Sequence, residues 1–147
     1  MIELIAIAKN GEPETPVGPL PEFAREILEQ TASLYAAEGY AKPWVGYLAR
    51  EDGACIGFCA FKTPPEDGAV EIAYATMPGH EGKGVATRMA AAVIEIARDE
   101  RPKITIRAQT LPEENASTAI LKKLGFALVG DVTHPEDGLV WEWRLAN

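Results

Sequence analysis

Cysteine and histidine are both scarce in this sequence of 147 residues, which contains two of each. Cys55 and Cys59 stand four positions apart in a stretch that we expect to be a strand. That spacing separates them by roughly 13 Å, too far for a mutual disulfide. His80 and His134 stand alone, without the Cys/His spacing of a metal site. A disulfide-stabilised fold and metal chemistry are therefore disfavoured, and we expect no metal.

Long apolar runs and an excess of basic charge are absent as well. No run approaches the roughly 20 apolar residues of a membrane span. Residues 1–8 have neither the basic flank nor the cleavage pattern of an export signal. The formal net charge of −8 argues against nucleic acid and favours a cationic partner, although most of these charges are expected simply to keep the surface soluble. We expect a cytoplasmic protein with no membrane or nucleic-acid partner.

What remains is the composition of an ordinary globular protein, with 47% hydrophobic and 24% charged residues. A chain of this length buries one core, so we expect a single domain over residues 1–147. Apolar periodicity and turn residues predict a helix at 21–39, a second at 85–100, and a short third one capped by Asn115 or Ser117. They also predict strands at 2–8, 44–50, 54–62, 71–76, 104–110, 126–132 and 139–145.

The order of these elements predicts an α/β fold with one mixed sheet of about seven strands and helices on both faces. Asp52-Gly53 marks a hairpin between the second and third strands. The strand at 104–110 is reached through a helix, so it is expected to lie parallel to the strand at 71–76. The first helix is expected to bury Phe23, Ile27, Leu28, Leu34 and Tyr35.

The most informative stretch runs from Glu71 to Thr87, as a strand, a glycine-rich bend and a helix start. Pro78-Gly79 closes the strand because proline cannot donate to a ladder. Gly82 and Gly84 leave the main chain open to close approach by a ligand. The first amides of a helix lack internal partners and lie at the positive end of its dipole, so this bend is suited to a phosphate or pyrophosphate. The helix that follows has an apolar stripe formed by Val85, Met89, Val93 and Ile96.

Three other interpretations of the bend are weaker. A P-loop requires Ser or Thr directly after Gly-Lys, whereas Gly84 follows Lys83. A dinucleotide fingerprint requires a third glycine or alanine where Thr87 stands, and it expects a parallel unit where antiparallel strands precede the bend. A glycine-rich turn that binds nothing is the remaining alternative on these residues alone.

Two spaced motifs resemble the GNAT superfamily of N-acyltransferases. The stretch P-x-x-E-G-K-G-V-A-T at 78–87 is similar to its acetyl-CoA signature, and E-N-A-S through K-K-L-G-F at 114–126 is similar to its second motif. The sequence around Gly57-Phe58 and at 70–74 resembles that of the subgroup that includes ribosomal-protein N-terminal acetyltransferases. The resemblance covers nearly the whole chain and implies an N-acetyltransferase that uses acetyl-CoA as co-substrate and a primary amine as acceptor.

The resemblance also implies a cofactor site, in which the central strand separates from its parallel neighbour and the pantetheine arm enters the gap. The arm would pair with the main chain of Tyr74, Ala75 and Thr76, with the Ala75 amide as donor to the developing oxyanion. The Asn115/Ser117 region would contact it from the other side. The pyrophosphate would be held by the amides of Gly82, Lys83, Gly84, Val85, Ala86 and Thr87.

Glu71 is the candidate base, because it stands where some family members have a catalytic glutamate. By the period of two it shares a face with Ala73 and Ala75, whose small side chains leave room for a substrate. A solvated strand charge is the alternative. Tyr74 is expected on the opposite face, as a core residue more often than a catalyst.

Two positions depart from the family pattern. Leu121 stands where many members have a tyrosine that protonates the leaving thiolate, so the acid is left unidentified. Glu81 stands where Arg or Gln is usual, and its charge either faces the pyrophosphate or turns outward.

Two other classes stay open: a non-catalytic acyl-CoA sensor with the same fold, and a dinucleotide-binding module. The identity of the acceptor amine, the length of the transferred acyl group and the formation of a homodimer do not follow from the sequence.

Overall fold

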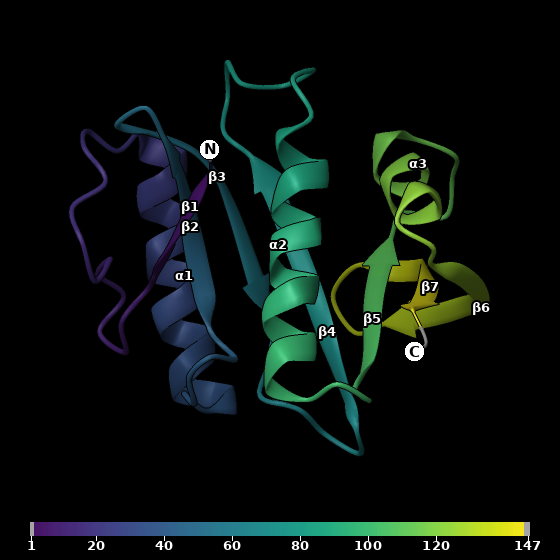
Figure 1. The fold of residues 1–147 in the computed structure, drawn as a ribbon. Helices are drawn as coiled ribbons and strands as arrows, with labels where there is room; N and C mark the ends of the chain where they lie inside the picture. Colours follow the sequence, from purple (N-terminus) through teal and green to yellow (C-terminus); the bar gives the residue numbers. More distant parts are fainter. Residues whose placement is uncertain (1, 146–147) are drawn as a thin grey trace.

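The computed structural model describes residues 2–145 and consists of a mixed sheet with helices on both faces (Figure 1). The sheet has seven strands in the order β1-β2-β3-β4-β5-β7-β6. The strands are β1 Glu3–Ala6, β2 Gly46–Glu51, β3 Ala54–Phe61, β4 Ala69–Thr76, β5 Thr105–Thr110, β6 Ala127–His134 and β7 Gly138–Leu145. The helices of the described residues are α1 Glu22–Glu38, α2 Val85–Glu100 and α3 Ala116–Lys123. None of the helices in residues 2–145 is long and apolar enough to span a membrane.

Adjacent residues of β3 show that α1 and α2 cover opposite faces of the sheet. A Cβ atom built on Gly57 would lie 2.5 Å from the sulfur of Met89 in α2. Phe58 points the other way, because its ring and Thr31 of α1 both lie within 3.3 Å of a Cβ built on Gly46. The close packing of α2 against β3 at this point therefore requires a residue without a side chain, such as Gly57.

The prediction for α1 was only partly correct. Ile27, Leu28 and Tyr35 are buried as expected. The Tyr35 hydroxyl donates to the Ile7 carbonyl, just past β1, and accepts from the Gly46 amide of β2, both at 2.9 Å, which fixes the helix to the sheet. Phe23 and Leu34, however, are 40% and 38% exposed. Both lie beside the buried stripe of α1 rather than within it, and Leu34 lines a groove on this face of the sheet.

Strands β4 and β5 are parallel, as the crossover through α2 requires, but they pair only over a short stretch. The paired residues are Ala69 with Thr105, Val70 with Ile106, and Glu71 with Arg107. Both strands continue past this point, β4 to Thr76 and β5 to Thr110. From Ile72 onward β4 therefore has no neighbour on its β5 side, and the sheet is open there.

The carboxyl ends of β4 and β5 lie at the same end of the sheet as the start of α2 and of α3 (Figure 1). The α3 helix starts with a capping box, in which the Asn115 side chain accepts from the Thr118 amide and the Thr118 hydroxyl accepts from the Asn115 amide. Two orphan amides at this helix start are thereby satisfied, so Asn115 rather than Ser117 is the cap.

Candidate active site

A groove of about 470 Å³ lies between the carboxyl end of β4, the bend and α3. It is next to the opening of the sheet and on the face covered by α2, since Tyr74 and Thr76 pair with Cys59 and Gly57 and so share the Gly57 face. Its lining contains most of the predicted cofactor residues: Tyr74, Ala75, Thr76, Gly82, Gly84, Val85, Ala86, Thr87 and Ser117. It also contains Glu81, Ala116, Ala119 and Ile120.

The bend has the geometry that its two glycines predict. Gly82 and Gly84 have φ angles of 77° and 73°, a left-handed conformation that side chains disfavour. No atom lies within 4 Å of a Cβ built on either residue, so the space above them is open. Gly84 is the N-cap of α2. Because a glycine cap has no side chain, it cannot satisfy the first amides of the helix, and these are left for an anion.

The Glu81 side chain lines the groove, and its carboxylate is held at the bend. Its Oε1 accepts a hydrogen bond from the Gly79 amide at 2.8 Å, so the carboxylate is folded back onto the bend. Hydrogen bonds from the backbone amides of Glu81 and Gly79 hold the pKa of this carboxyl below its usual range. The charge stays at one wall of the groove, where Glu81 is among the lining residues.

The opposite wall brings Tyr74 of β4 next to Ser117 of α3. Burial raises the pKa of the Tyr74 hydroxyl, and the nearby Ser117 hydroxyl acts in the opposite direction. The tyrosine does face away from Glu71, as expected, and it packs against the core. It is nevertheless only partly buried and lines the groove, so its description as a core residue was incomplete.

Two predicted cofactor residues do not line this groove. Lys83 lines a separate cavity together with Glu51, Asp52 and Arg88. Asn115 is occupied by the capping box of α3. Conversely, Ala116, Ala119 and Ile120 were not predicted individually. Their spacing of three and four residues along α3, which puts them on the same helix face, was the available signal.

The register of β3 and β4 determines which main-chain groups face the opening. The Lys62 amide donates to the Glu71 carbonyl, and the Met77 amide donates to the Ile56 carbonyl, both at 2.9 Å. In an antiparallel ladder, hydrogen-bonded pairs alternate, so the pair of Phe58 and Ala75 belongs to the same set. The Ala75 amide is thus directed toward β3, and the amides of Tyr74 and Thr76 face the opening instead. This corrects the expectation for Ala75.

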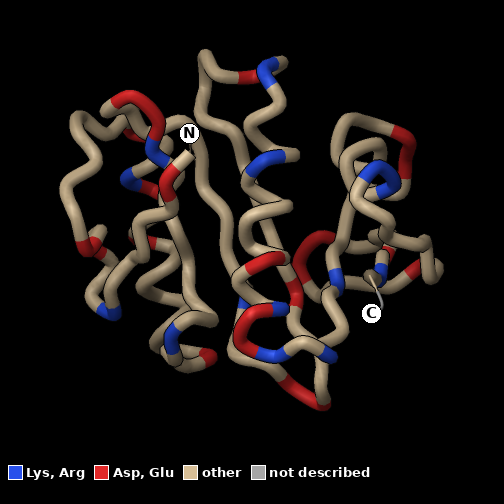
Figure 2. Tube along the Cα trace, in the orientation of Figure 1, with Lys and Arg blue, Asp and Glu red and all other residues tan. Residues whose placement is uncertain are grey.

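A second groove, of about 810 Å³, lies on the opposite face of the sheet, against α1. Its apolar floor comes from Ile27, Leu34, Phe58, Ala60 and Ala73. Its other lining residues are Gln30, Thr31, Glu38, Lys62 and residues 134–137 of the β6–β7 turn. This turn reaches back beside β4 in Figure 1 and carries acidic residues in Figure 2.

Glu71 forms an ion pair with Lys62 on the face of this second groove. The Lys62 Nζ lies 2.8 Å from Oε2 of Glu71, and the two side chains are 38% and 16% exposed. The Oε2 atom is buried, and the ammonium contacts it without meeting the angles of a hydrogen bond. Glu71 shares its sheet face with Ala73, two residues closer to the opening. The nominated base therefore lies near the groove but already has a cationic partner.

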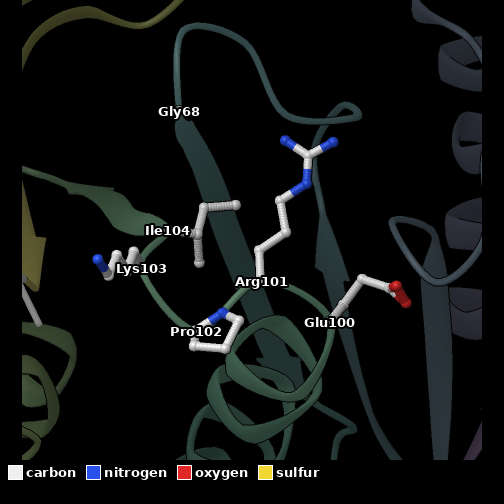
Figure 3. Close-up of a pocket in the computed structure, with 6 residues that line it drawn as sticks. All are labelled: Gly68, Glu100, Arg101, Pro102, Lys103 and Ile104. Carbon is white, nitrogen blue, oxygen red and sulfur yellow. The ribbon is translucent and has the colours of Figure 1, made fainter.

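A further cavity, of about 540 Å³, lies at the opposite end of α2 from the bend (Figure 3). It is formed by Gly68 and residues 100–104, at the carboxyl end of α2 and the start of β4 and β5. Figure 3 shows the Arg101 side chain extending across it. The Arg101 guanidinium lies 5.9 Å from the ring centroid of Trp44. The cavity has no carboxylate pair or nucleophile, and we assign no chemistry to it.

The strand order, the parallel β4–β5 pair and the flanking helices define a GNAT-like fold. The sequence matches the acetyltransferase (GNAT) domain over residues 5–127. The chain therefore belongs to the GNAT acetyltransferase family, and it is an N-acetyltransferase of that type. No curated protein sequence matches it.

Solved structures agree on the fold. RimL, a ribosomal L7/L12 alpha-N-protein acetyltransferase in complex with coenzyme A, superposes with a TM-score of 0.71 at 18% identity, over 99% of this chain and 93% of RimL. An acetyltransferase from Salmonella typhimurium that modifies the N-terminal serine of L7/L12 gives 0.68 at 17% identity, over 99% and 95%. The microcin C7 self-immunity acetyltransferase MccE, in complex with acetyl-CoA and AMP, gives 0.66 at 16% identity, over 85% and 71%.

Proposed function

We propose that this protein transfers an acetyl group from acetyl-CoA to a primary amine by direct attack of the amine on the thioester. The observation that carries the proposal is the position of the two grooves. They lie on opposite faces of the sheet, and both reach β4 near the place where it loses its β5 neighbour. A thioester that enters from the α2 face thus meets an amine that enters from the α1 face.

The groove on the α2 face suits coenzyme A. The open amides at the start of α2 would bind the pyrophosphate, since they combine free donors with the positive end of the helix dipole. The free main-chain groups of Tyr74 and Thr76 would bind the pantetheine arm in place of the missing strand, and their amides are the donors that we assign to the oxyanion. Asn115 would support this wall indirectly, by fixing the start of α3.

The groove on the α1 face suits a positively charged amine. Glu38, Glu136 and Asp137 line it, against the single ammonium of Lys62. An acceptor amine arrives as an ammonium and must lose a proton, because an ammonium has no lone pair with which to attack. Glu71 is the base we assign, with Lys62 holding its carboxylate in place until the acceptor binds. Either a small amine or a protein N-terminus fits this description.

The experiment is a thiol-release assay with acetyl-CoA and a panel of amino acids, polyamines, aminoglycosides and peptide N-termini. We expect release that depends on an amine and that is fastest with a cationic acceptor. Glu136→Gln should weaken selection of the cationic acceptor, while Glu113→Gln, at an exposed site outside both grooves, should not. Retention of acetyl-CoA without turnover over the whole panel would support an acyl-CoA sensor instead.

A further inference from the structure

Direct acetyl transfer, on which this inference rests, leaves the sulfur of coenzyme A as a thiolate that needs a proton. Leu121 occupies the position where the family pattern provides a tyrosine for this purpose. Its side chain is apolar and fully buried, with 0% exposure, so it can neither donate a proton nor admit a water to do so. The chain must supply the proton from another group in the cofactor groove, or from solvent.

The lining of that groove offers few acids. Its hydroxyls are those of Tyr74, Thr76, Thr87 and Ser117. Aliphatic hydroxyls are far weaker acids than a phenol, whose ordinary pKa is about 10. The Glu81 carboxyl is ionised at neutral pH because backbone amides hold its pKa down, and it is fixed at the bend. Tyr74 is the remaining proton donor among the described lining residues.

The position of Tyr74 fits this role. It lies three residues beyond Glu71, the last β4 residue paired with β5, so its backbone borders the opening of the sheet. Its side chain projects to the α2 face and lines the groove together with Ser117 of α3. The Ser117 hydroxyl acts to lower the pKa of the phenol, in agreement with the position of the two residues in the lining of one groove, where β4 faces α3. A phenol is ordinarily protonated at neutral pH, and burial raises its pKa further.

We propose that the Tyr74 hydroxyl is the general acid that protonates the sulfur of coenzyme A, with Ser117 as the residue that positions it. The amine nitrogen forms a bond with the carbonyl carbon, the C–S bond breaks, and its electron pair goes to sulfur. The phenol O–H proton passes to that sulfur, which leaves as a thiol. The phenolate regains a proton from solvent through the Ser117 hydroxyl, and the proton lost by the amine leaves through Glu71.

The test measures the thiol of bound coenzyme A directly, so it needs no acceptor. A phenol that donates to the sulfur stabilises the thiolate, which is the form that iodoacetamide alkylates. We expect alkylation of bound coenzyme A at neutral pH to be about tenfold slower in Tyr74→Phe than in wild type. The thiol should also titrate at higher pH in the variant, while the Kd for coenzyme A stays within about twofold. Tyr40→Phe, which alters a tyrosine outside the groove, is the matched control and should behave as wild type.

Equal alkylation rates and equal titration in wild type and Tyr74→Phe would overturn the proposal. If Tyr74→Phe does not fold, Ser117→Ala provides the test. The thiol of bound coenzyme A should then titrate at higher pH than in wild type, and wild-type titration would overturn the proposal. With an accepted amine, Tyr74→Phe should lower kcat by roughly 10²-fold with little change in the acceptor KM. Failure of every amine to react would refute acetyl transfer but would leave the thiol titration readable, so the two failures are distinguishable.

Discussion

Gly84 provides the sharpest test of the phosphate-binding bend. Its φ of 73° lies in the left-handed region, and no atom stands within 4 Å of a Cβ built on it. Gly84→Ala therefore clashes with nothing in the protein, and its cost to folding is the backbone strain of about 1–2 kcal/mol. The new methyl group, however, would project at the first amides of α2, where the pyrophosphate is expected.

The consequence for binding can be estimated separately. Loss of one hydrogen bond to a charged phosphate oxygen costs about 1.5–3 kcal/mol, which raises the Kd for coenzyme A by roughly 10- to 150-fold. Gly84→Val, with a bulkier side chain, should abolish binding in the measurable range. Isothermal titration calorimetry gives the Kd, and thermal unfolding gives the stability of the same samples.

Gly53 supplies a matched control. It has a φ of 79° and equally open surroundings, but it lies in the β2–β3 hairpin and does not line the groove. Gly53→Ala should lose similar stability and keep wild-type affinity. Wild-type affinity in Gly84→Val, or an equal loss of affinity in Gly53→Ala, would refute the assignment of the bend.

Three further predictions concern the base, the bend and the core. Glu71→Gln should lower turnover by roughly 10²–10⁴-fold without changing the Kd for coenzyme A. The loss should shrink at high pH, where free amine is abundant. An unchanged rate at neutral pH would show that Glu71 is not part of the mechanism. Glu81→Gln should bind coenzyme A up to about fivefold more tightly than wild type at low salt, and the difference should fade as salt rises. Equal Kd values at low salt would mean that the charge of Glu81 does not affect coenzyme A binding. Gly57→Ala should lower the free energy of unfolding by about 1–3 kcal/mol, because its methyl group would meet Met89, and unchanged denaturant unfolding would contradict that packing.

Local features of the sequence predicted the fold and the bend well. The α2 helix begins at Val85 and ends at Glu100, as its apolar stripe and the following proline predict. The two bend glycines could be assigned for the same reason, since a left-handed conformation is a property of a single residue. Exposure of Phe23 and Leu34 could not be predicted in this way, because it depends on how distant segments pack against α1.

Features that join distant segments could not be predicted from the sequence. The direction of the Ala75 amide depends on the pairing of β3 with β4, and a shift by one residue would reverse it. The ion pair of Glu71 with Lys62 depends on the same pairing. The groove on the α1 face is assembled from α1, β3, β4 and the β6–β7 turn, so no single motif marks it.

The most direct test of acetyl transfer follows the acetyl group itself. The protein is incubated with acetyl-CoA that carries a deuterated acetyl group and with the best amine of the panel, and the products are analysed by mass spectrometry. We predict the labelled acetyl group on the amine nitrogen, with one free coenzyme A for each product molecule. Labelled acetate without labelled amide, or bound acetyl-CoA that stays intact, would contradict the account.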